Sequence, residues 1–189
     1  MLDAAGGAQL LLVAHSLGAQ LVGETLASDS TLRTALRASP LRTLAYFAPD
    51  VAIDRFNAYI LPATNALAER IVLYASTKDR LLALSRAVNR SERSGLLRKA
   101  TLPPAGLELI DVTRGASAEN PIQRVFGSHH ALRRASAALF DLFSIVAQGY
   151  SADCRERLGT AHANTLGIWE LTAMSPPLVS VAARCTRVQ

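Results

Sequence analysis

The chain has no long hydrophobic run, although half of its 189 residues are hydrophobic. No apolar stretch approaches the roughly 18 to 20 residues that a membrane-spanning helix needs. The opening residues, 1–7, also lack the basic segment and the long apolar segment of a secretory signal. We therefore expect no membrane span, and the chain as written is expected to be cytoplasmic.

Cysteine is scarce, since only Cys154 and Cys185 are present and both lie in the last quarter of the chain. Two distant cysteines give neither a disulfide framework nor the ligand spacing of a metal site. We interpret them as free thiols and expect no metal ion and no cofactor.

Lysine is almost absent, because Lys78 and Lys99 are the only two and arginine supplies nearly all of the net charge of +5. Most of the arginines are scattered, which does not predict a nucleic-acid-binding face. One basic cluster has a spacing close to that of a single helical face; it comprises Arg86, Arg90, Arg93, Arg98 and Lys99. A solvated surface helix explains this cluster, with an anionic ligand or partner as the alternative.

Short apolar runs alternate with helical patterns along most of the chain. The runs predict strands at 10–13, 41–47, 70–76 and 107–112, and the patterns between and after them predict helices at 18–26, 31–37, 54–67, 81–89 and 131–147. This alternation predicts an α/β fold with about four parallel strands and flanking helices. The pattern fades after Gly149, so we assign no structure to the tail of residues 150–189 apart from a possible helix around Trp169.

The stretch Ala14-His15-Ser16-Leu17-Gly18 lies where the first apolar run passes into a helix. A serine at such a point occupies a strained turn that raises its hydroxyl above the sheet edge. Small residues at positions 14 and 18 are expected to let the strand and the helix approach each other. The Leu17 amide would point at an oxyanion formed when Ser16 attacks an acyl carbon. Ser16 is therefore a candidate nucleophile, with an ordinary helix N-cap as the alternative.

A serine nucleophile needs a base and an acidic residue that orients the base. Asp79 follows the third predicted strand, and His129 and His130 follow the fourth. Because the carboxyl ends of parallel strands meet at one edge of a sheet, these residues can converge on Ser16. The order serine, acid, histidine is the one expected of α/β-hydrolases. Asp50, which follows the second strand, is an alternative acid, and either aspartate could instead cap a helix or stabilise a turn.

Taken together, these segments resemble a bacterial α/β-hydrolase family of poorly characterised, esterase- or lipase-like proteins. The resemblance covers about residues 8–147 and rests on the serine turn and on the segments 47–50, 74–79 and 110–112 ahead of His129. It implies Ser16 as nucleophile, Asp79 as acid and a histidine near position 129 as base. The spacing to Asp141 favours His129, with His130 as the alternative. The resemblance further implies hydrolysis of a small-molecule carboxylic ester through an acyl-enzyme.

The family fold also implies several strands and a helix ahead of the nucleophile strand. We therefore expect residues 1–149 to be the C-terminal portion of a hydrolase domain, with an open edge on its first strand and only the Leu17 amide as oxyanion donor. The alternative function is a truncated, catalytically impaired remnant that acts as a binding module or has no function. An open edge would also permit self-association.

Overall fold

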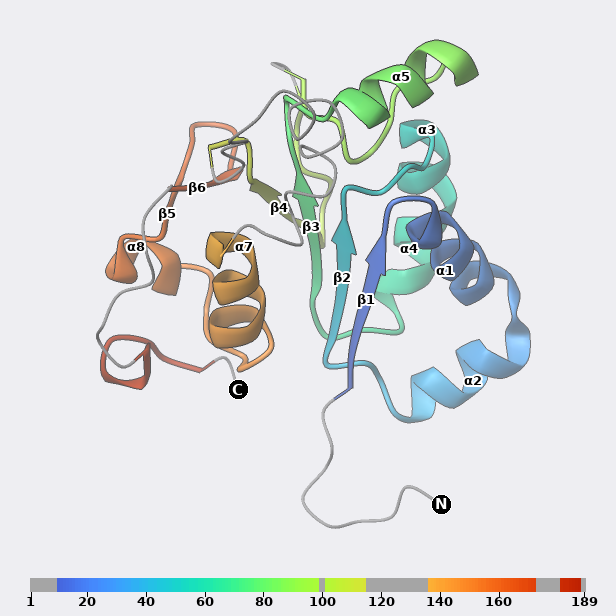
Figure 1. The fold of residues 1–189 in the computed structure, drawn as a ribbon. Coiled ribbons are helices and arrows are strands. Elements are labelled where there is room, and N and C mark those ends of the chain that lie inside the picture. Colours follow the sequence, from blue (N-terminus) through green and yellow to red (C-terminus); the bar gives the residue numbers. More distant parts are fainter. Residues whose placement is uncertain (1–9, 99–100, 115–135, 173–180, 188–189) are drawn as a thin grey trace.

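The computed structural model describes residues 10–98, 101–114, 136–172 and 181–187, which form one six-stranded sheet with helices on both faces (Figure 1). The strand order is β1-β2-β3-β4-β6-β5. Five strands are parallel to one another, and β5 pairs with β6 in the antiparallel sense. The strands are β1 (Leu11–His15), β2 (Thr43–Phe47), β3 (Ile71–Ala75), β4 (Glu108–Asp111), β5 (Ala161–Ala163) and β6 (Trp169–Leu171). The predicted α/β class with a parallel sheet is confirmed.

The C-terminal part of the chain extends the sheet beyond the four predicted strands. Trp169 lies in β6 rather than in a helix, and β6 pairs with β4 through Ile110 and Asp111. Strands of three residues are too short to show a periodic pattern in the sequence, which explains why β5 and β6 were not predicted. They lie at the edge opposite β1, so within the described residues β1 pairs only with β2.

The helices follow the predicted ones closely where the structure describes them. They are α1 (Leu17–Ser28), α2 (Ser30–Ala38), α3 (Ile53–Arg55), η1 (Phe56–Ile60), α4 (Leu61–Asn65), α5 (Arg80–Asn89), α7 (Ser136–Phe140), η3 (Asp141–Val146), α8 (Cys154–Leu158) and η4 (Val181–Ala183). The side chain of Asp29 caps α2 by accepting a hydrogen bond of 2.9 Å from the Leu32 amide. The first five residues of the helix predicted over 131–147 lie outside the described residues.

A proline would break an ideal α-helix, but here the helical run continues through Pro62 because the turn before it widens. Residues 56–60 form a π-helical turn in which the Leu61 amide donates to the carbonyl of Phe56, five residues earlier. Proline lacks an amide hydrogen and clashes with the carbonyl of the preceding turn. A π-turn directly before it changes the hydrogen-bond register at that point, so α3, η1 and α4 continue as one helical run.

Two apolar cores lie on the two faces of the sheet, because alternate residues of a strand point to opposite faces. In β2, Tyr46 faces the core under α1, η1 and α4, where its ring meets that of Phe56 edge-on at 5.3 Å. Phe47 faces the other core, where it stacks on Tyr74 at 4.2 Å and where η3 also packs. All residues of β2 and β3 are buried, which is typical of parallel strands covered on both faces.

Small residues on α1 bring this helix close to its neighbours, as the sequence predicts. Ala19, Gly23, Leu26 and Ala27 are its buried residues. A Cβ atom on Gly23 would lie 2.7 Å from a side-chain methyl of Ile60, so the glycine is required for this close approach. Helix α1 is thereby fixed against η1, and its first turn is held where the β1 strand ends.

The prediction of free thiols is wrong, because Cys154 and Cys185 form a disulfide. The bond joins α8 to the segment after η4, across 31 positions of sequence. Sequence spacing could not reveal it, since pairing depends on how the C-terminal segment folds back onto α8.

In the ranges that the structure describes, none of the helices combines the length and the apolar character that a membrane crossing requires.

Candidate functional site

Ser16 occupies the turn between β1 and α1 in a strained backbone conformation. Its φ of 54° and ψ of −127° lie in a region that residues with a side chain rarely adopt. Such a conformation costs of order 1–3 kcal/mol and persists only where the surroundings enforce it. The Ser16 amide donates to the Phe47 carbonyl at 3.0 Å, and the Ser16 carbonyl accepts from the amides of Ala19 and Asp50. Three backbone contacts therefore hold the strained turn in place.

The hydroxyl of Ser16 does not serve as a helix cap. Ser16 is the N-cap residue of α1, yet its side chain makes no capping hydrogen bond to that helix. The serine is half-buried, at the end of β1 and beside the first turn of α1. This geometry disfavours the alternative of an ordinary capping serine.

The two small residues beside Ser16 differ in importance. Ala14 is buried under α1, as expected for a residue that lets strand and helix approach. By contrast, a Cβ atom on Gly18 would meet nothing within 4 Å, so the expectation that Gly18 is needed for room is wrong. Leu17 is the first residue of α1, and the amides of a first helical turn have no acceptor inside their helix.

Asp79 is almost completely buried at the N-terminus of α5, four residues after β3 ends. Its Oδ1 accepts a hydrogen bond of 3.0 Å from the Leu82 amide, so the capping role considered from the sequence is present. Because β1 and β3 are parallel to β2 and flank it, Asp79 and Ser16 lie at the same end of the sheet. A carboxylate has two oxygens that accept hydrogen bonds, so this cap does not by itself exclude a further contact.

The Asp50 amide donates to the Ser16 carbonyl, but the Asp50 carboxylate contacts other residues. The Ser85 hydroxyl donates to it at 2.7 Å, and Arg93 Nε lies 3.1 Å from the same Oδ1. These contacts tie the end of β2 to α5 and to the segment after it. The carboxylate of Asp50 therefore has a structural explanation that does not involve a histidine.

The two candidate bases cannot be placed, since His129 and His130 lie outside the described residues. Two other histidines are described. His15 is the half-buried last residue of β1, and His162 lies in the exposed part of β5, 3.5 Å from a carboxylate oxygen of Glu170.

Local acids pair with part of the basic cluster predicted around α5, and Lys99 lies outside the described residues. Arg86 and Arg98 both form ion pairs with Glu92, and Arg93 pairs with Asp50. Helix α5 ends at Asn89, so the arginines do not share one helical face. Helix α5 itself is largely exposed, with Leu82 as its buried residue, which agrees with a solvated surface helix, whereas Arg93 beyond the helix is buried.

A segment that the sequence analysis did not single out crosses the ends of β2 and β3. The Gly95 amide donates to the Pro49 carbonyl, and the Gly95 carbonyl accepts from the Ser76 amide. A Cβ atom on Gly95 would lie 2.6 Å from the backbone carbon of Ala48. Only glycine fits between these strand ends, which lie next to Ser16 and Asp79.

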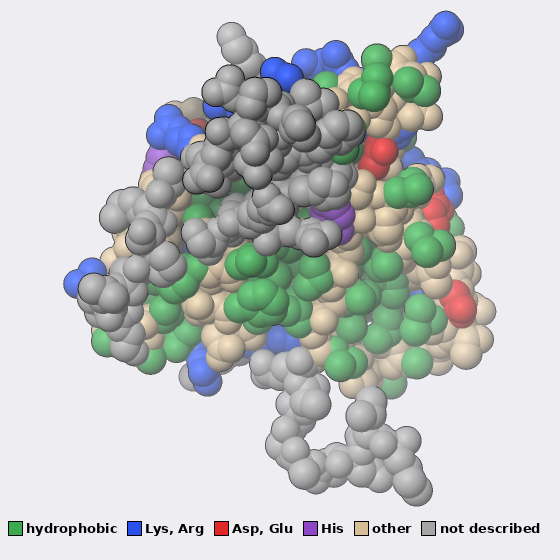
Figure 2. Space-filling model, viewed as in Figure 1, with side chains coloured by type: hydrophobic (Ala, Val, Ile, Leu, Met, Phe, Trp, Pro, Cys, Tyr) green, Lys and Arg blue, Asp and Glu red, His purple; other side chains and the backbone are tan. Residues whose placement is uncertain are grey.

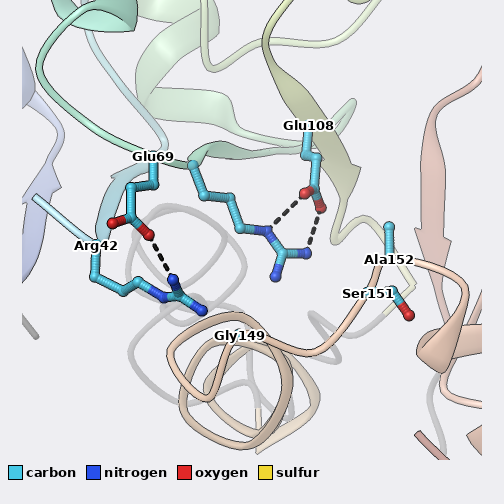
Figure 3. A pocket seen from close by; sticks show the side chains of 7 residues that line it. Arg42, Glu69, Glu108, Gly149, Ser151 and Ala152 are labelled. Atoms are coloured by element: carbon cyan, nitrogen blue, oxygen red, sulfur yellow. Dashed lines mark hydrogen bonds and ion pairs between the residues drawn. The ribbon is translucent and has the colours of Figure 1, made fainter. Parts of the chain in front are cut away.

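A cavity of about 500 Å³ lies at the other end of the sheet, where the strands begin (Figure 3). Its lining residues are Arg42, Glu69, Arg70, Glu108, Gly149, Ser151 and Ala152. Since catalytic groups of open α/β sheets lie at the carboxyl ends of the strands, this cavity is not part of the Ser16 site.

A buried ion network extends from that end of the sheet under β3 and β4, and the sequence analysis missed it. Arg70 binds Glu108 with two nitrogens, at 2.6 and 2.8 Å. Arg155, fully buried, contacts the same Glu108 at 2.8 Å and binds Asp141 at 2.6 Å. The Tyr74 hydroxyl donates to Asp141 at 2.7 Å. No local pattern reveals such a network, because its members come from four separate elements.

The network shifts the pKa values of its members. Burial raises the pKa of Tyr74 well above its usual value, and the Asp141 charge raises it further. Burial alone would raise the pKa of Glu108, but hydrogen bonds and charge from Arg70 and Arg155 outweigh it and lower the pKa. Burial opposes the charged form of Arg155, and the carboxylates of Asp141 and Glu108 more than compensate, so the pKa of Arg155 is raised.

A match to a known protein family shows the family to which this chain belongs. Residues 2–132 match the family described as "Alpha/beta hydrolase of unknown function (DUF900)", which covers more than half of the chain. The chain belongs to this family. The match includes β1 to β4, Ser16, Asp79 and both candidate histidines. No curated protein and no solved structure matches the chain significantly. The match therefore shows that the chain is an α/β-hydrolase, but it does not define the reaction.

Proposed function

We propose that this α/β-hydrolase cleaves a small-molecule carboxylic ester through an acyl-enzyme, with Ser16 as the nucleophile. The observation that carries the proposal is the backbone of Ser16, held at a positive φ by β2 and by the Asp50 amide. Strain of this kind is maintained at functional sites. Its position between strand and helix is that of a nucleophile elbow.

In the proposed reaction the Ser16 oxygen attacks the ester carbonyl carbon while His129 accepts the hydroxyl proton. The Leu17 amide stabilises the negative oxygen of the tetrahedral intermediate. Collapse of this intermediate breaks the bond to the alcohol, which leaves with the proton returned by His129. A water molecule, deprotonated by the same histidine, then attacks the acyl-enzyme and releases the acid and free Ser16. His130 is the alternative base.

Asp79 is proposed as the acid that orients the histidine. Its burial and its position after β3 support this role over that of Asp50, whose carboxylate is bound by Ser85 and Arg93. The cap on α5 fixes the Asp79 carboxylate in one orientation, which is the property an orienting acid requires.

A fluorophosphonate probe tests the proposal directly, because it forms a covalent bond with activated serines only. We expect the probe to label Ser16 in the wild-type chain and in Ser85→Ala, and to leave Ser16→Ala unlabelled. Peptide mapping by mass spectrometry identifies the modified residue. A folded, monodisperse sample that is not labelled at Ser16 would overturn the assignment.

A second candidate function is that of a catalytically impaired family member that acts as a binding module. The observation that favours it is the outer edge of β1, which pairs with no other strand in the described part of the chain. This candidate predicts a folded chain that binds a partner but neither reacts with the probe nor hydrolyses short-chain nitrophenyl esters. Labelling of Ser16 together with turnover excludes it.

A further inference from the structure

The loop between β3 and α5, which carries Asp79, is bound on one side by the segment that follows α5. The Ser76 amide donates to the Gly95 carbonyl at 3.1 Å, and the Leu97 amide donates to the Ser76 carbonyl at 3.1 Å. These two bonds fix the start of the loop relative to that segment. They do not reach β4, which lies on the other side of β3 from β2.

The other side of this loop is bound by the hydroxyl of Thr113, two residues after β4 ends. Thr113 Oγ1 accepts a hydrogen bond of 2.9 Å from the Thr77 amide. The hydroxyl oxygens of Ser76 and Thr77 lie 3.3 and 3.2 Å from the same atom. Ser76 Oγ in turn accepts from the Lys78 amide at 3.1 Å. Because a hydroxyl accepts and donates at once, Thr113 can bind a backbone amide and a neighbouring hydroxyl together.

The backbone of Thr113 is itself held in register with β3. Its amide donates to Oδ1 of Asp111 at 2.7 Å, and the Val112 amide donates to the Ala75 carbonyl at 2.9 Å. The pairing of β3 with β4 thus continues one residue beyond β4. The Asp111 carboxylate bends the backbone into a turn directly afterwards, which is a role that aspartate takes readily. A fixed backbone therefore presents the Thr113 hydroxyl to the loop.

Short uncharged side chains make this link between the loop and β4. Ser76 is buried and Thr113 is half-buried, whereas Lys78 is exposed. Figure 2 shows basic side chains at the surface near α5, at the same end of the molecule. Hydrogen bonds between short side chains hold a loop more rigidly than contacts of long charged ones, because fewer rotatable bonds have to be fixed.

The link joins the two parts of the chain that carry the proposed acid and the proposed base. Strand β3 leads to Asp79, and β4 leads to His129 and His130. We propose that Thr113 is a positioning residue of the catalytic site, which fixes the Asp79 loop against the start of the histidine segment. This inference rests on the proposed function, because that reaction requires the acid and the base to keep a constant separation.

The cap on α5 and the Thr113 hydroxyl act on different neighbours. Asp79 Oδ1 accepts from the Leu82 amide, which orients the carboxylate relative to α5. Thr113 fixes the residues just before Asp79 relative to β4. An imidazole supplied from beyond β4 meets the carboxylate correctly only if both relations hold. Loss of the hydroxyl should displace the acid without unfolding the sheet, since the bond between Val112 and Ala75 does not involve it.

Hydrolysis of a short-chain nitrophenyl ester tests the inference in Thr113→Val, which keeps the shape of the side chain and removes its hydroxyl. We expect kcat to fall by about ten- to hundredfold, because a misplacement of about 1 Å can cost about 10²-fold. KM should change by less than about twofold, because the histidine acts in both acylation and deacylation. Thr113→Ser restores the hydroxyl and should recover most of the lost kcat. The rate of fluorophosphonate labelling at Ser16 should fall and recover in parallel.

Thr101→Val is the matched control. Thr101 is also half-buried, and its Oγ1 also accepts a backbone amide hydrogen bond of 2.9 Å, in this case from Arg98. This variant should keep the wild-type kcat. Thermal unfolding shows whether each variant is folded. If Thr113→Val does not fold, Ser76→Ala decides the question, because it removes the acceptor of the Lys78 amide from the same loop and should lower kcat by about tenfold at unchanged KM.

The possible results separate this inference from the proposed function. A wild-type chain that neither hydrolyses the ester nor reacts at Ser16 overturns both. An active wild type with unchanged kcat and labelling rate in folded Thr113→Val, or in Ser76→Ala in its place, overturns the positioning role alone. So does a loss of kcat that Thr113→Ser does not recover, or one that Thr101→Val shares.

Discussion

The two ends of the parallel sheet place polar residues in opposite ways. At the end where the strands begin, Arg70, Glu108 and Arg155 form ion pairs and hydrogen bonds among themselves. At the end where the strands finish, Ser16 is held in a strained turn and its hydroxyl does not cap α1. One end uses buried and half-buried charges to join β3, β4 and α8, while the other holds the strained turn of Ser16 and the buried Asp79. The comparison shows that the ion network and the strained turn lie at opposite ends of the strands.

The largest expected effect distinguishes the two aspartates at the Ser16 end of the sheet. If Asp79 orients the base, Asp79→Asn should lower kcat by about 10⁴-fold, as the loss of an orienting acid does in serine proteases. Asp50→Asn should cost far less activity, because its carboxylate contacts Ser85 and Arg93. Ester hydrolysis measured on both variants decides the assignment. Equal losses of activity in the two variants would contradict the assignment of Asp79, rather than Asp50, as the orienting acid.

At the other end, Arg155→Met should destabilise the fold by about 3–5 kcal/mol, because it leaves Asp141 buried without its cation. Arg157→Met is the matched control, since Arg157 and its partner Asp153 are both about half exposed. An exposed pair contributes about 0–1 kcal/mol. Urea unfolding of both variants measures the difference, and similar losses in the two would contradict the structural role of the network.

Acid should weaken the ion network through Glu108, whose pKa is lowered in the folded chain. A lowered pKa contributes stability above the ordinary value of 4.5, and this contribution is lost as the pH falls through the folded value. Glu108→Gln should therefore be less stable at neutral pH and lose less additional stability between neutral pH and acid. Unfolding midpoints collected across this range provide the measurement. A variant with the same pH dependence as wild type would remove Glu108 from the explanation.

The smallest effect concerns the strain at Ser16. Ser16→Gly should stabilise the fold by up to about 1 kcal/mol, because glycine adopts a positive φ without steric cost. The gain is reduced by the greater freedom of glycine in the unfolded chain. Ser16→Ala keeps the strain and serves as the control in thermal unfolding. A glycine variant clearly less stable than the alanine variant would show that the turn is not strained in solution.

Local patterns in the sequence predicted much of the fold. Apolar runs located β1 to β4, and the residue spacing located α1, α2 and α5, because burial on a sheet imposes periods that can be counted. Asp29 caps α2, which is the local role that aspartate favours at the start of a helix. The strand–turn–helix at Ser16 was also visible, although the positive φ that distinguishes the residue was measurable only in the folded chain.

The remaining features depend on residues that are distant in sequence. The Cys154–Cys185 disulfide, β6 beside β4 and the Arg155 network all join segments whose proximity exists only after folding. The disulfide also bears on the location of the chain, because such bonds persist in oxidising compartments. A cytoplasmic location thus stays a prediction.

The sequence by itself predicted the strands β1 to β4, the helices α1, α2 and α5 and the candidate nucleophile, because these follow from short-range periodicity and turn chemistry. The resemblance of its short motifs indicated the family. Only the tertiary structure decided that Asp50 is bound by Ser85 and Arg93, and that Glu92 pairs with Arg86 and Arg98. It also decided that the strand carrying Ser16 lies at the sheet edge in the described residues. The physical reason is that charge pairing, disulfide formation and edge exposure are set by distances through space, which sequence spacing does not encode.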